Sequence, residues 1–248
     1  MSTFSSFNLK ATSLAVLDAM NIDTPTPIQE QSIPELLEGA DLIGQAQTGS
    51  GKTLAFGLPL IEACDPRYKD VQALVLVPTR ELATQVGGVL SQLAAPAQLR
   101  VAVIYGGVGM VPQVEALQRG SQIVVGTPGR ILDHLYRGSL KLNEVGFLVL
   151  DEADQMLDQG FAPDVERIIS TTPSDRQTVL FSATTPDWVM RVAAKHLTEP
   201  VFLKVDPEES EPNIEHSVVE CWDGDKITAL LALLDQPSDG ATLVFGRT

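Results

Sequence analysis

A glycine-rich segment at residues 46–53 (AQTGSGKT) has the composition of a loop that binds phosphate groups. Gly49 and Gly51 can adopt at low cost the backbone dihedrals that such a loop needs to wrap a phosphate chain. The loop amides and the N-terminus of a following helix would then face anionic oxygens. Lys52 would reach the β and γ phosphates, and the hydroxyl of Thr53 would bind Mg²⁺.

This segment predicts a site for the phosphate chain of a nucleotide. The strict phosphate-loop pattern begins with glycine, whereas this chain has Ala46 at that position. A flexible Gly/Ser loop is the alternative, but a strand-like run before the segment and a helix-like stretch after it favour the nucleotide site. The expected contact residues are Ala46, Gln47, Thr48, Gly49, Ser50, Gly51, Lys52 and Thr53.

A second cluster of chemically capable residues lies at 147–154 (FLVLDEAD). An apolar strand delivers Asp151 to its carboxyl end, where a carboxylate can hold the Mg²⁺ shell, and Glu152 can orient or deprotonate an attacking water. Phosphoryl transfer requires little more of side chains than positioning, a metal and charge compensation. The alternative is an acidic helix N-terminus stabilised by the helix dipole. The Lys52 loop upstream makes the catalytic interpretation the stronger one.

Thr26, Pro27 and Gln29 form the pattern of a capping box at the start of a helix. Threonine would be the N-cap, proline the first helical residue, and the glutamine side chain would reach back to the cap. This local role explains Gln29 completely. A second role, in which its amide reads an adenine base, needs support from outside the residues themselves.

Short β-branched runs alternate with amphipathic stretches along residues 1–205, and these elements would position the two clusters. Several runs lack polar alternation, which is typical of strands buried on both faces. The order predicts a doubly wound α/β fold with a mainly parallel sheet, helices on both faces and ligands at the carboxyl ends of the strands. The expected strands are 41–44, 73–77, 101–104, 122–125, 147–150, 178–181 and 201–203, and the expected helices are 52–63, 80–93, 114–118, 130–136, 164–170 and 187–196.

The composition excludes several classes of protein. The 248 residues carry 17 Lys and Arg against 32 Asp and Glu, and the formal net charge of −15 disfavours a simple basic nucleic-acid binder. A hydrophobic content of 44% excludes global disorder, and two cysteines are too few for a disulfide scaffold or a cysteine zinc site. Without an apolar run of membrane-spanning length or a signal-peptide pattern, a cytoplasmic protein is expected.

The composition changes near residue 205. Residues 206–216 are rich in acids and contain two prolines, which predicts a solvated linker. After it, residues 217–220 and 241–245 resemble strands and residues 227–234 resemble a helix. Residues 217–248 are therefore expected to be the incomplete start of a second α/β unit.

Taken together, in this order and at this spacing, the motifs resemble those of the DEAD-box family of ATP-dependent RNA helicases. The resemblance covers residues 4 to about 205 as one complete RecA-like P-loop NTPase domain, and residues 243–248 (LVFGRT) resemble the first motif of the family's second RecA-like domain. The motifs are 24–29 (TPTPIQ), 46–53 (AQTGSGKT), 78–83 (PTRELA), 106–107 (GG), 127–130 (TPGR), 151–154 (DEAD) and 182–184 (SAT).

The resemblance implies a complete set of contacts to ATP and Mg²⁺. Gln29 would read the adenine and Phe4 would stack on it, while Ala46 is ordinary for the family's phosphate loop. Asp151 would bind Mg²⁺ together with the loop, and Glu152 would be the catalytic base.

The resemblance also assigns coupling and RNA-binding residues. Asp154 would bond to Ser182 and Thr184 and so link the nucleotide site to strand separation. Three other segments follow strands and expose backbone N–H groups, and two of them carry a single arginine (Arg80 and Arg130), so they would hold RNA phosphates and sugars. Taken alone, each has a plainer interpretation as a helix start, a turn or a solvated residue. The RNA-binding residues would be Pro78, Thr79, Arg80, Gly106, Gly107, Thr127, Pro128, Gly129 and Arg130.

Family members hydrolyse ATP between two RecA-like domains, and the second domain supplies arginine fingers and half of the RNA cleft. The 248 residues contain no motif of the His-Arg-Ile-Gly-Arg type. An arginine finger is worth about 10³ to 10⁵ in rate. This polypeptide is therefore expected to bind adenine nucleotide, to hydrolyse ATP slowly and not to unwind duplex RNA alone. A nucleotide-gated RNA-binding module without turnover is the alternative function.

Overall fold

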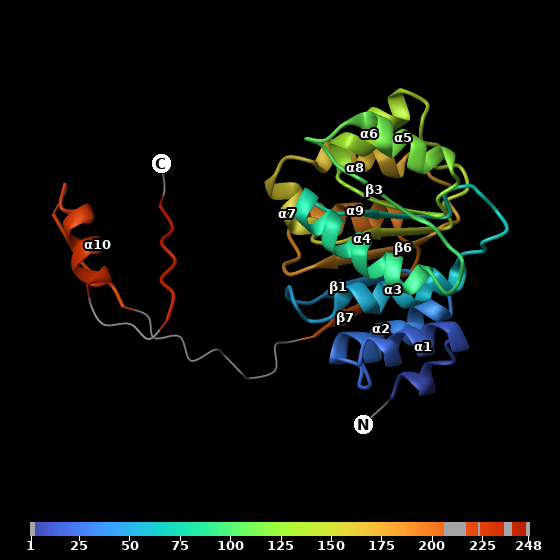
Figure 1. Ribbon diagram of the computed structural model, residues 1–248, viewed down its shortest axis with the longest axis horizontal. Helices are drawn as coiled ribbons and strands as arrows, with labels where there is room; N and C mark the ends of the chain where they lie inside the picture. Colours follow the sequence, from blue (N-terminus) through green and yellow to red (C-terminus); the bar gives the residue numbers. More distant parts are fainter. Residues whose placement is uncertain (1–2, 206–216, 223, 236–239, 247–248) are drawn as a thin grey trace. The chain divides into compact units, whose positions relative to one another are not determined.

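The computed structural model describes residues 3–205, 217–222, 224–235 and 240–246. Contacts between residues divide the chain into two units, Met1–Pro207 and Glu208–Thr248, coloured blue to orange and red in Figure 1. The boundary lies near the change in composition at residue 205. The linker expected at 206–216 lies outside the described residues.

The first unit is built on a seven-stranded sheet in which every pair of neighbouring strands is parallel. The spatial order is β3-β4-β2-β5-β6-β1-β7. All seven strands expected from the sequence are present, as is the expected parallel pairing. The strands are β1 (Leu42–Gln45), β2 (Ala73–Leu76), β3 (Val101–Ile104), β4 (Ile123–Gly126), β5 (Phe147–Leu150), β6 (Gln177–Ser182) and β7 (Val201–Lys204).

Helices cover both faces of this sheet (Figure 1). The buried apolar side chains form two separate cores. Alternate residues of one strand enter different cores: Val149 of β5 lies in one, and Leu148 and Leu150 lie in the other. This arrangement explains why the strand sequences lack polar alternation. The helical elements of the first unit are η1 (Phe4–Phe7), α1 (Ala11–Ala19), α2 (Pro27–Leu37), α3 (Lys52–Ala63), α4 (Arg80–Ala94), α5 (Met110–Gln118), α6 (Pro128–Tyr136), α7 (Ala153–Asp158), α8 (Ala162–Ile169) and α9 (Asp187–His196).

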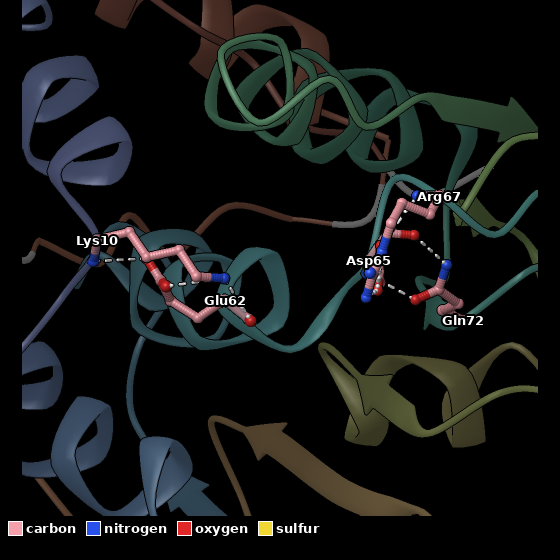
Figure 2. Close-up of polar contacts among 5 residues, drawn as sticks. All are labelled: Lys10, Glu62, Asp65, Arg67 and Gln72. Carbon is pink, nitrogen blue, oxygen red and sulfur yellow. Dashed lines mark hydrogen bonds and ion pairs between the residues drawn. The ribbon is translucent and has the colours of Figure 1, made fainter.

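Polar contacts fix the far end of α3, the helix that begins at the glycine-rich loop. Glu62 Oε1 accepts a hydrogen bond from the Lys10 backbone N–H at 3.0 Å (Figure 2). It also accepts from Ser13 Oγ at 2.6 Å, so it ties α3 to the start of α1. Just beyond α3, Gln72 exchanges two 2.8 Å hydrogen bonds with the backbone of Asp65. The helix is therefore anchored at the end opposite the candidate site.

The described part of the second unit contains α10 (Lys226–Leu234), which confirms the helix expected at 227–234. The strands expected at 217–220 and 241–245 are not formed in the structure, and this prediction is wrong for the described residues. A strand needs a neighbouring strand to satisfy its backbone groups. Within residues 217–222, 224–235 and 240–246, no such pairing is present.

None of the helices in the described ranges combines the length and the apolar character that crossing a membrane requires.

Alanine substitutions at two adjacent glycines of α4 should have opposite effects on the free energy of unfolding. A Cβ atom on Gly87 would lie 2.5 Å from Cγ2 of Val103 on β3, whereas a Cβ on Gly88 would meet nothing within 4 Å. Gly87→Ala should lower the free energy of unfolding by about 1–3 kcal/mol because it overpacks the interface between helix and sheet. Gly88→Ala should raise it by about 0.5–1 kcal/mol because alanine favours a helix interior.

Urea denaturation followed by circular dichroism measures both changes, and each variant serves as the matched control for the other. Shifts of the same sign would contradict the packing of α4 against β3.

Candidate nucleotide-binding site

The strand order brings the two clusters found in the sequence to one edge of the sheet. Strand β6 pairs with β1 on one side and with β5 on the other, so the segments that follow these three strands leave the sheet side by side. A hydrogen bond joins the outer two segments, because Thr48 Oγ1 donates to Glu152 Oε1 at 3.0 Å. The loop that contains Lys52 and the Asp151–Glu152 pair therefore meet, as the sequence predicted.

The loop has the backbone shape that its glycines were expected to allow. Gly49 and Gly51 have φ of +86° and +93°, in the left-handed region that favours glycine. A Cβ on Gly51 would also lie 2.4 Å from Nε2 of Gln29, so space as well as conformation requires glycine there. The Lys52 side chain is buried, and its Nζ donates to the carbonyl oxygen of Ala46 at 3.2 Å. A phosphate entering the loop would offer this ammonium group a charged acceptor in place of a neutral one.

The start of α2 is joined directly to the loop. The capping box is present, with the Thr26 backbone N–H donating to Gln29 Oε1 at 3.0 Å. In addition, Thr26 Oγ1 donates to the Ser50 carbonyl at 2.8 Å and Gln29 Nε2 donates to the Gly51 carbonyl at 2.9 Å. The contacts from Thr26 to the loop were not foreseen, because a threonine N-cap already has a sufficient local role. The amide of Gln29 keeps one N–H and one lone pair for another partner.

The acidic pair occupies an electrostatically costly position. Asp151 and Glu152 are both buried, and Asp151 Oδ1 accepts from the Glu152 backbone N–H at 3.1 Å. Burial raises the pKa of Asp151 to about 6, although the nearby charge of Lys52 opposes the shift, and the Glu152 carboxylate adds to it. Glu152 has φ of +54°, a strained conformation for a residue with a side chain. Buried charge and backbone strain together mark this as a functional position.

The metal-binding groups at this site, the Asp151 carboxylate and the Thr53 hydroxyl, fit Mg²⁺ that is bound together with a nucleotide better than Mg²⁺ that is bound alone. Across the described ranges, no three His, Cys, Asp or Glu side chains are grouped so that they could hold a metal ion. Asp151 offers one carboxylate at the carboxyl end of β5, and Thr53 offers a hydroxyl in the first turn of α3. Mg²⁺ in nucleotide sites typically takes one or two protein ligands and completes its shell with phosphate oxygens and water.

The segment after β6 contacts the acidic motif as expected. Asp154 Oδ2 accepts from Thr184 twice, from the backbone N–H at 2.9 Å and from Oγ1 at 2.8 Å, and the Asp154 backbone N–H donates to Ser182 Oγ at 3.3 Å. Burial alone would raise the pKa of Asp154, but these hydrogen bonds outweigh it and lower the pKa. The Asp154 carboxylate is therefore held ionised as a fixed link between α7 and the end of β6.

The three segments that the resemblance assigned to RNA also lie along the carboxyl edge, where residues 78–80 follow β2, residues 106–107 follow β3 and residues 127–130 follow β4. Thr79 caps α4, with its Oγ1 accepting from the Leu82 N–H at 3.2 Å. Arg80 forms an exposed ion pair with Glu81 at 2.6 Å. Gly107 has φ of +83°, and a Cβ there would lie 3.6 Å from the Arg80 guanidinium, so the first two segments meet.

The third segment forms the start of α6. Thr127 is the N-cap, Pro128 is the first helical residue, and a Cβ on Gly129 would meet nothing within 4 Å. The Arg130 side chain, however, is only 13% exposed, and Nη2 donates to the Val108 carbonyl at 3.1 Å. This arginine is turned towards the protein and does not project as a free charge.

Phe4 and Pro78 are also less accessible than their expected roles suggest. The ring of Phe4 is 3% exposed and packs edge-to-face against Phe7, with centroids 5.9 Å apart, so neither face is open for stacking. Pro78 is buried at the end of β2. The structure therefore places Phe4 near the core, and its contact with a base stays a prediction.

A comparison with known families identifies the chain. A profile described as DEAD/DEAH box helicase matches residues 26–192, which is more than half of the sequence. The chain belongs to the DEAD/DEAH box helicase family. The matched range includes the capping box, the loop, the acidic motif and the segment after β6.

Individual relatives agree with this assignment. The DEAD-box ATP-dependent RNA helicase CshA of Bacillus cereus is 46% identical over the whole chain and is 47% covered by it. A DEAD box protein from Methanococcus jannaschii has a crystal structure that matches 94% of this chain with a TM-score of 0.80 and 41% identity, and 63% of that protein is covered. A hypothetical ATP-dependent RNA helicase from Sulfolobus tokodaii matches with a TM-score of 0.73, 33% identity, and coverage of 79% and 57%.

These matches have two consequences. The parallel sheet is the RecA-like P-loop NTPase fold that the resemblance predicted. The chain spans about half the length of the curated DEAD-box relatives that it matches.

The raised pKa of Asp151 predicts a pH-dependent stability difference. An ionised, buried Asp151 destabilises the ligand-free protein, and this cost develops as the pH rises from the unfolded pKa near 4 to the folded pKa of about 6. Asp151→Asn should therefore be the more stable form above pH 6. Its advantage should increase by about 1 kcal/mol between pH 5 and pH 7 and then level off.

Urea denaturation at several pH values measures this advantage, and Asp158→Asn, at an exposed aspartate of α7, is the matched control. An advantage that does not change with pH would show that Asp151 titrates normally.

Proposed function

We propose that this chain is the ATP-binding and RNA-binding half of an ATP-dependent RNA helicase, which couples ATP hydrolysis to local separation of RNA strands. The observation that carries the proposal is the hydrogen bond between Thr48 and Glu152, because it joins the phosphate loop to the acidic motif. The sequence alone suggested each half of such a site. Their contact supports a single site that holds a triphosphate and hydrolyses it.

In this function each residue of the site has a physical task. The loop amides and the α3 N-terminus bind the phosphates, and Lys52 leaves the Ala46 carbonyl to pair with the β and γ oxygens. Thr53 and Asp151 would hold Mg²⁺, which would supply the charge compensation that phosphoryl transfer requires. A carboxylate destabilised by burial gains most from such a cation, which agrees with the raised pKa of Asp151.

Glu152 acts as the general base that orients and deprotonates the attacking water. The Thr48 hydroxyl holds one carboxylate oxygen, and the strained backbone at the start of α7 aims the side chain at the loop. The second oxygen is then available to the water. The arrangement positions the base before any nucleotide arrives.

Base recognition uses Gln29. Adenine presents an amino group at N6 and an acceptor at N7, and the amide of Gln29 retains one lone pair and one N–H beyond its bonds to Thr26 and Gly51. The capping role and the adenine role are therefore compatible. Stacking by Phe4 requires η1 to move, because its ring is covered.

Coupling and RNA binding use the remaining motifs. Asp154, Ser182 and Thr184 connect the hydrolysis site to the end of β6, and the segments that contain Arg80, Gly107 and Thr127 receive the RNA backbone. Contacts through backbone N–H groups carry little base preference. ATP and RNA as ligands agree with the cytoplasmic location expected from the sequence.

As a polypeptide of 248 residues, the chain binds nucleotide and hydrolyses it slowly. The proposal rests on the resemblance, which assigns the arginine fingers to a second RecA-like domain, and on the chain's coverage of about half of its relatives. The domain assignment of residues 1–205, 206–216 and 217–248 is part of the same proposal.

The substitution Glu152→Gln separates the proposed enzyme from a nucleotide-gated RNA-binding module without turnover. In the enzyme, the variant should bind MgADP within about twofold of the unaltered chain, because the substitution preserves size and removes only the base. Hydrolysis should fall by about 10²-fold or more. Single-turnover hydrolysis of labelled ATP with protein in excess measures the rate, and calorimetry measures affinity.

Glu115→Gln, at an exposed glutamate of α5, is the control for the loss of one negative charge. A slow hydrolysis rate that Glu152→Gln leaves unchanged, with nucleotide and RNA binding intact, would favour the module and reject turnover by this site.

A further inference from the structure

A buried polar network lies directly beneath two of the proposed RNA-contacting segments. At its centre is Gln113 of α5, whose side chain is buried. Gln113 Nε2 donates to the carbonyl of Tyr105 at 3.0 Å, and Oε1 lies 3.0 Å from His134 Nε2 and 3.4 Å from Arg130 Nη1. Tyr105 directly precedes the Gly106-Gly107 turn, and the other two residues belong to α6. We call these groups, with Ser139, the Gln113 network.

Each hydrogen bond of Gln113 in this network has only one workable direction. The Tyr105 carbonyl can only accept, so it fixes the amide of Gln113 with Oε1 towards α6. His134 is fully buried, and burial lowers its pKa, so the ring is neutral with its hydrogen on Nε2. Ser139 Oγ lies 2.8 Å from the bare Nδ1 and 3.2 Å from the His134 carbonyl oxygen, and its single hydrogen can be donated to either acceptor. The hydrogen bonds of Gln113 to Tyr105, His134 and Arg130 have fixed directions, which rigidifies the segments that they join.

Arg130 adds a second connection between the same two segments. Its guanidinium donates to the Val108 carbonyl at 3.1 Å and to Gln113, and a weaker contact of 3.7 Å joins it to Asp133 on its own helix. The loop at 105–109 is thus bonded to α6 through both a neutral amide and a charged arginine. In these contacts the Arg130 guanidinium is bonded to the protein itself, whereas its expected role is to bind an RNA phosphate.

We propose that Gln113 and His134 are positioning residues that hold the Gly106-Gly107 turn and the N-terminus of α6 in the arrangement that receives consecutive phosphates of an RNA backbone. The inference rests on the proposed function, since it assumes that these two segments contact RNA. Gln113 and His134 are buried and act only through the segments above them. Backbone donors bind strongly only when they are already oriented, because ordering them on binding costs free energy. Arg130 acts within this network and not as a free charge.

The test compares RNA affinity with nucleotide affinity in the 248-residue chain. Gln113→Met keeps the volume of the side chain and removes all three of its hydrogen bonds, so it should weaken binding of a fluorescent single-stranded oligouridylate by about five- to tenfold. MgADP affinity, measured by calorimetry, should stay within twofold. Hydrogen exchange of the amides at 106–109 and at the start of α6 should become faster, while α3 is unchanged. Gln118→Met, at an exposed glutamine of the same helix, is the matched control.

A second variant keeps the test decisive if Gln113→Met does not fold. Ser139→Ala removes only the outermost contacts of the network, those of Ser139 Oγ with Nδ1 and the carbonyl oxygen of His134. The residue is half-buried, and the loss of its hydroxyl should shift RNA affinity in the same direction by about twofold to fivefold. RNA affinity that is unchanged in a folded Gln113→Met variant would overturn the inference and leave the proposed function standing. An unaltered chain that binds MgADP but no RNA would overturn both the RNA-binding proposal and this inference.

Discussion

The position of β6 between β1 and β5 is the constraint on which the candidate site depends. Because β6 pairs with both, the phosphate loop after β1 and the acidic motif after β5 end on either side of the segment 182–184, close enough for Thr48 to bond to Glu152. The same placement lets Asp154 bond to Thr184. A different strand order would separate these side chains although each element remained intact. The burial of all three strands by two apolar cores holds this order in place.

The sequence predicted the elements of the first unit well because their signals are local. Strands such as Val101–Ile104 and helices such as Asp187–His196 have the expected bounds, since β-branched runs and amphipathic periodicity reflect burial directly. The helix α1 was not expected, because polar and apolar residues in its sequence (ATSLAVLDA) are not separated into two faces. The six-residue helix α7 was foreseen only as the alternative interpretation of the acidic motif. The strands expected in the second unit are not formed in the described residues, because a strand depends on a partner and not on a local signal alone. Their residues favour extended backbone, but no partner strand among the described residues pairs with them.

The sequence predicted a site residue well when its role follows from the residue type alone. It predicted less well those residues whose role depends on burial and on neighbouring groups. The two loop glycines and Lys52 follow from what a phosphate requires. The covered ring of Phe4 and the inward guanidinium of Arg130 do not, because residue type gives no information about burial. Gln113 and His134 could not be found from the sequence, since a lone glutamine and a lone histidine carry no pattern. Their importance lies in hydrogen bonds between segments distant along the chain.

Two hydrogen bonds join α2 to the phosphate loop, from Thr26 to Ser50 and from Gln29 to Gly51. In the proposed function they would make base selection and phosphate binding one process. The amide that would face the base is the same group that braces the entrance to the phosphate cradle. A guanine presents a carbonyl where adenine presents an amino group, so it would repel the oxygen of Gln29 and displace that brace. The choice between purines would then affect the position of the γ phosphate. A guanine nucleotide would be bound in a distorted position and not only more weakly.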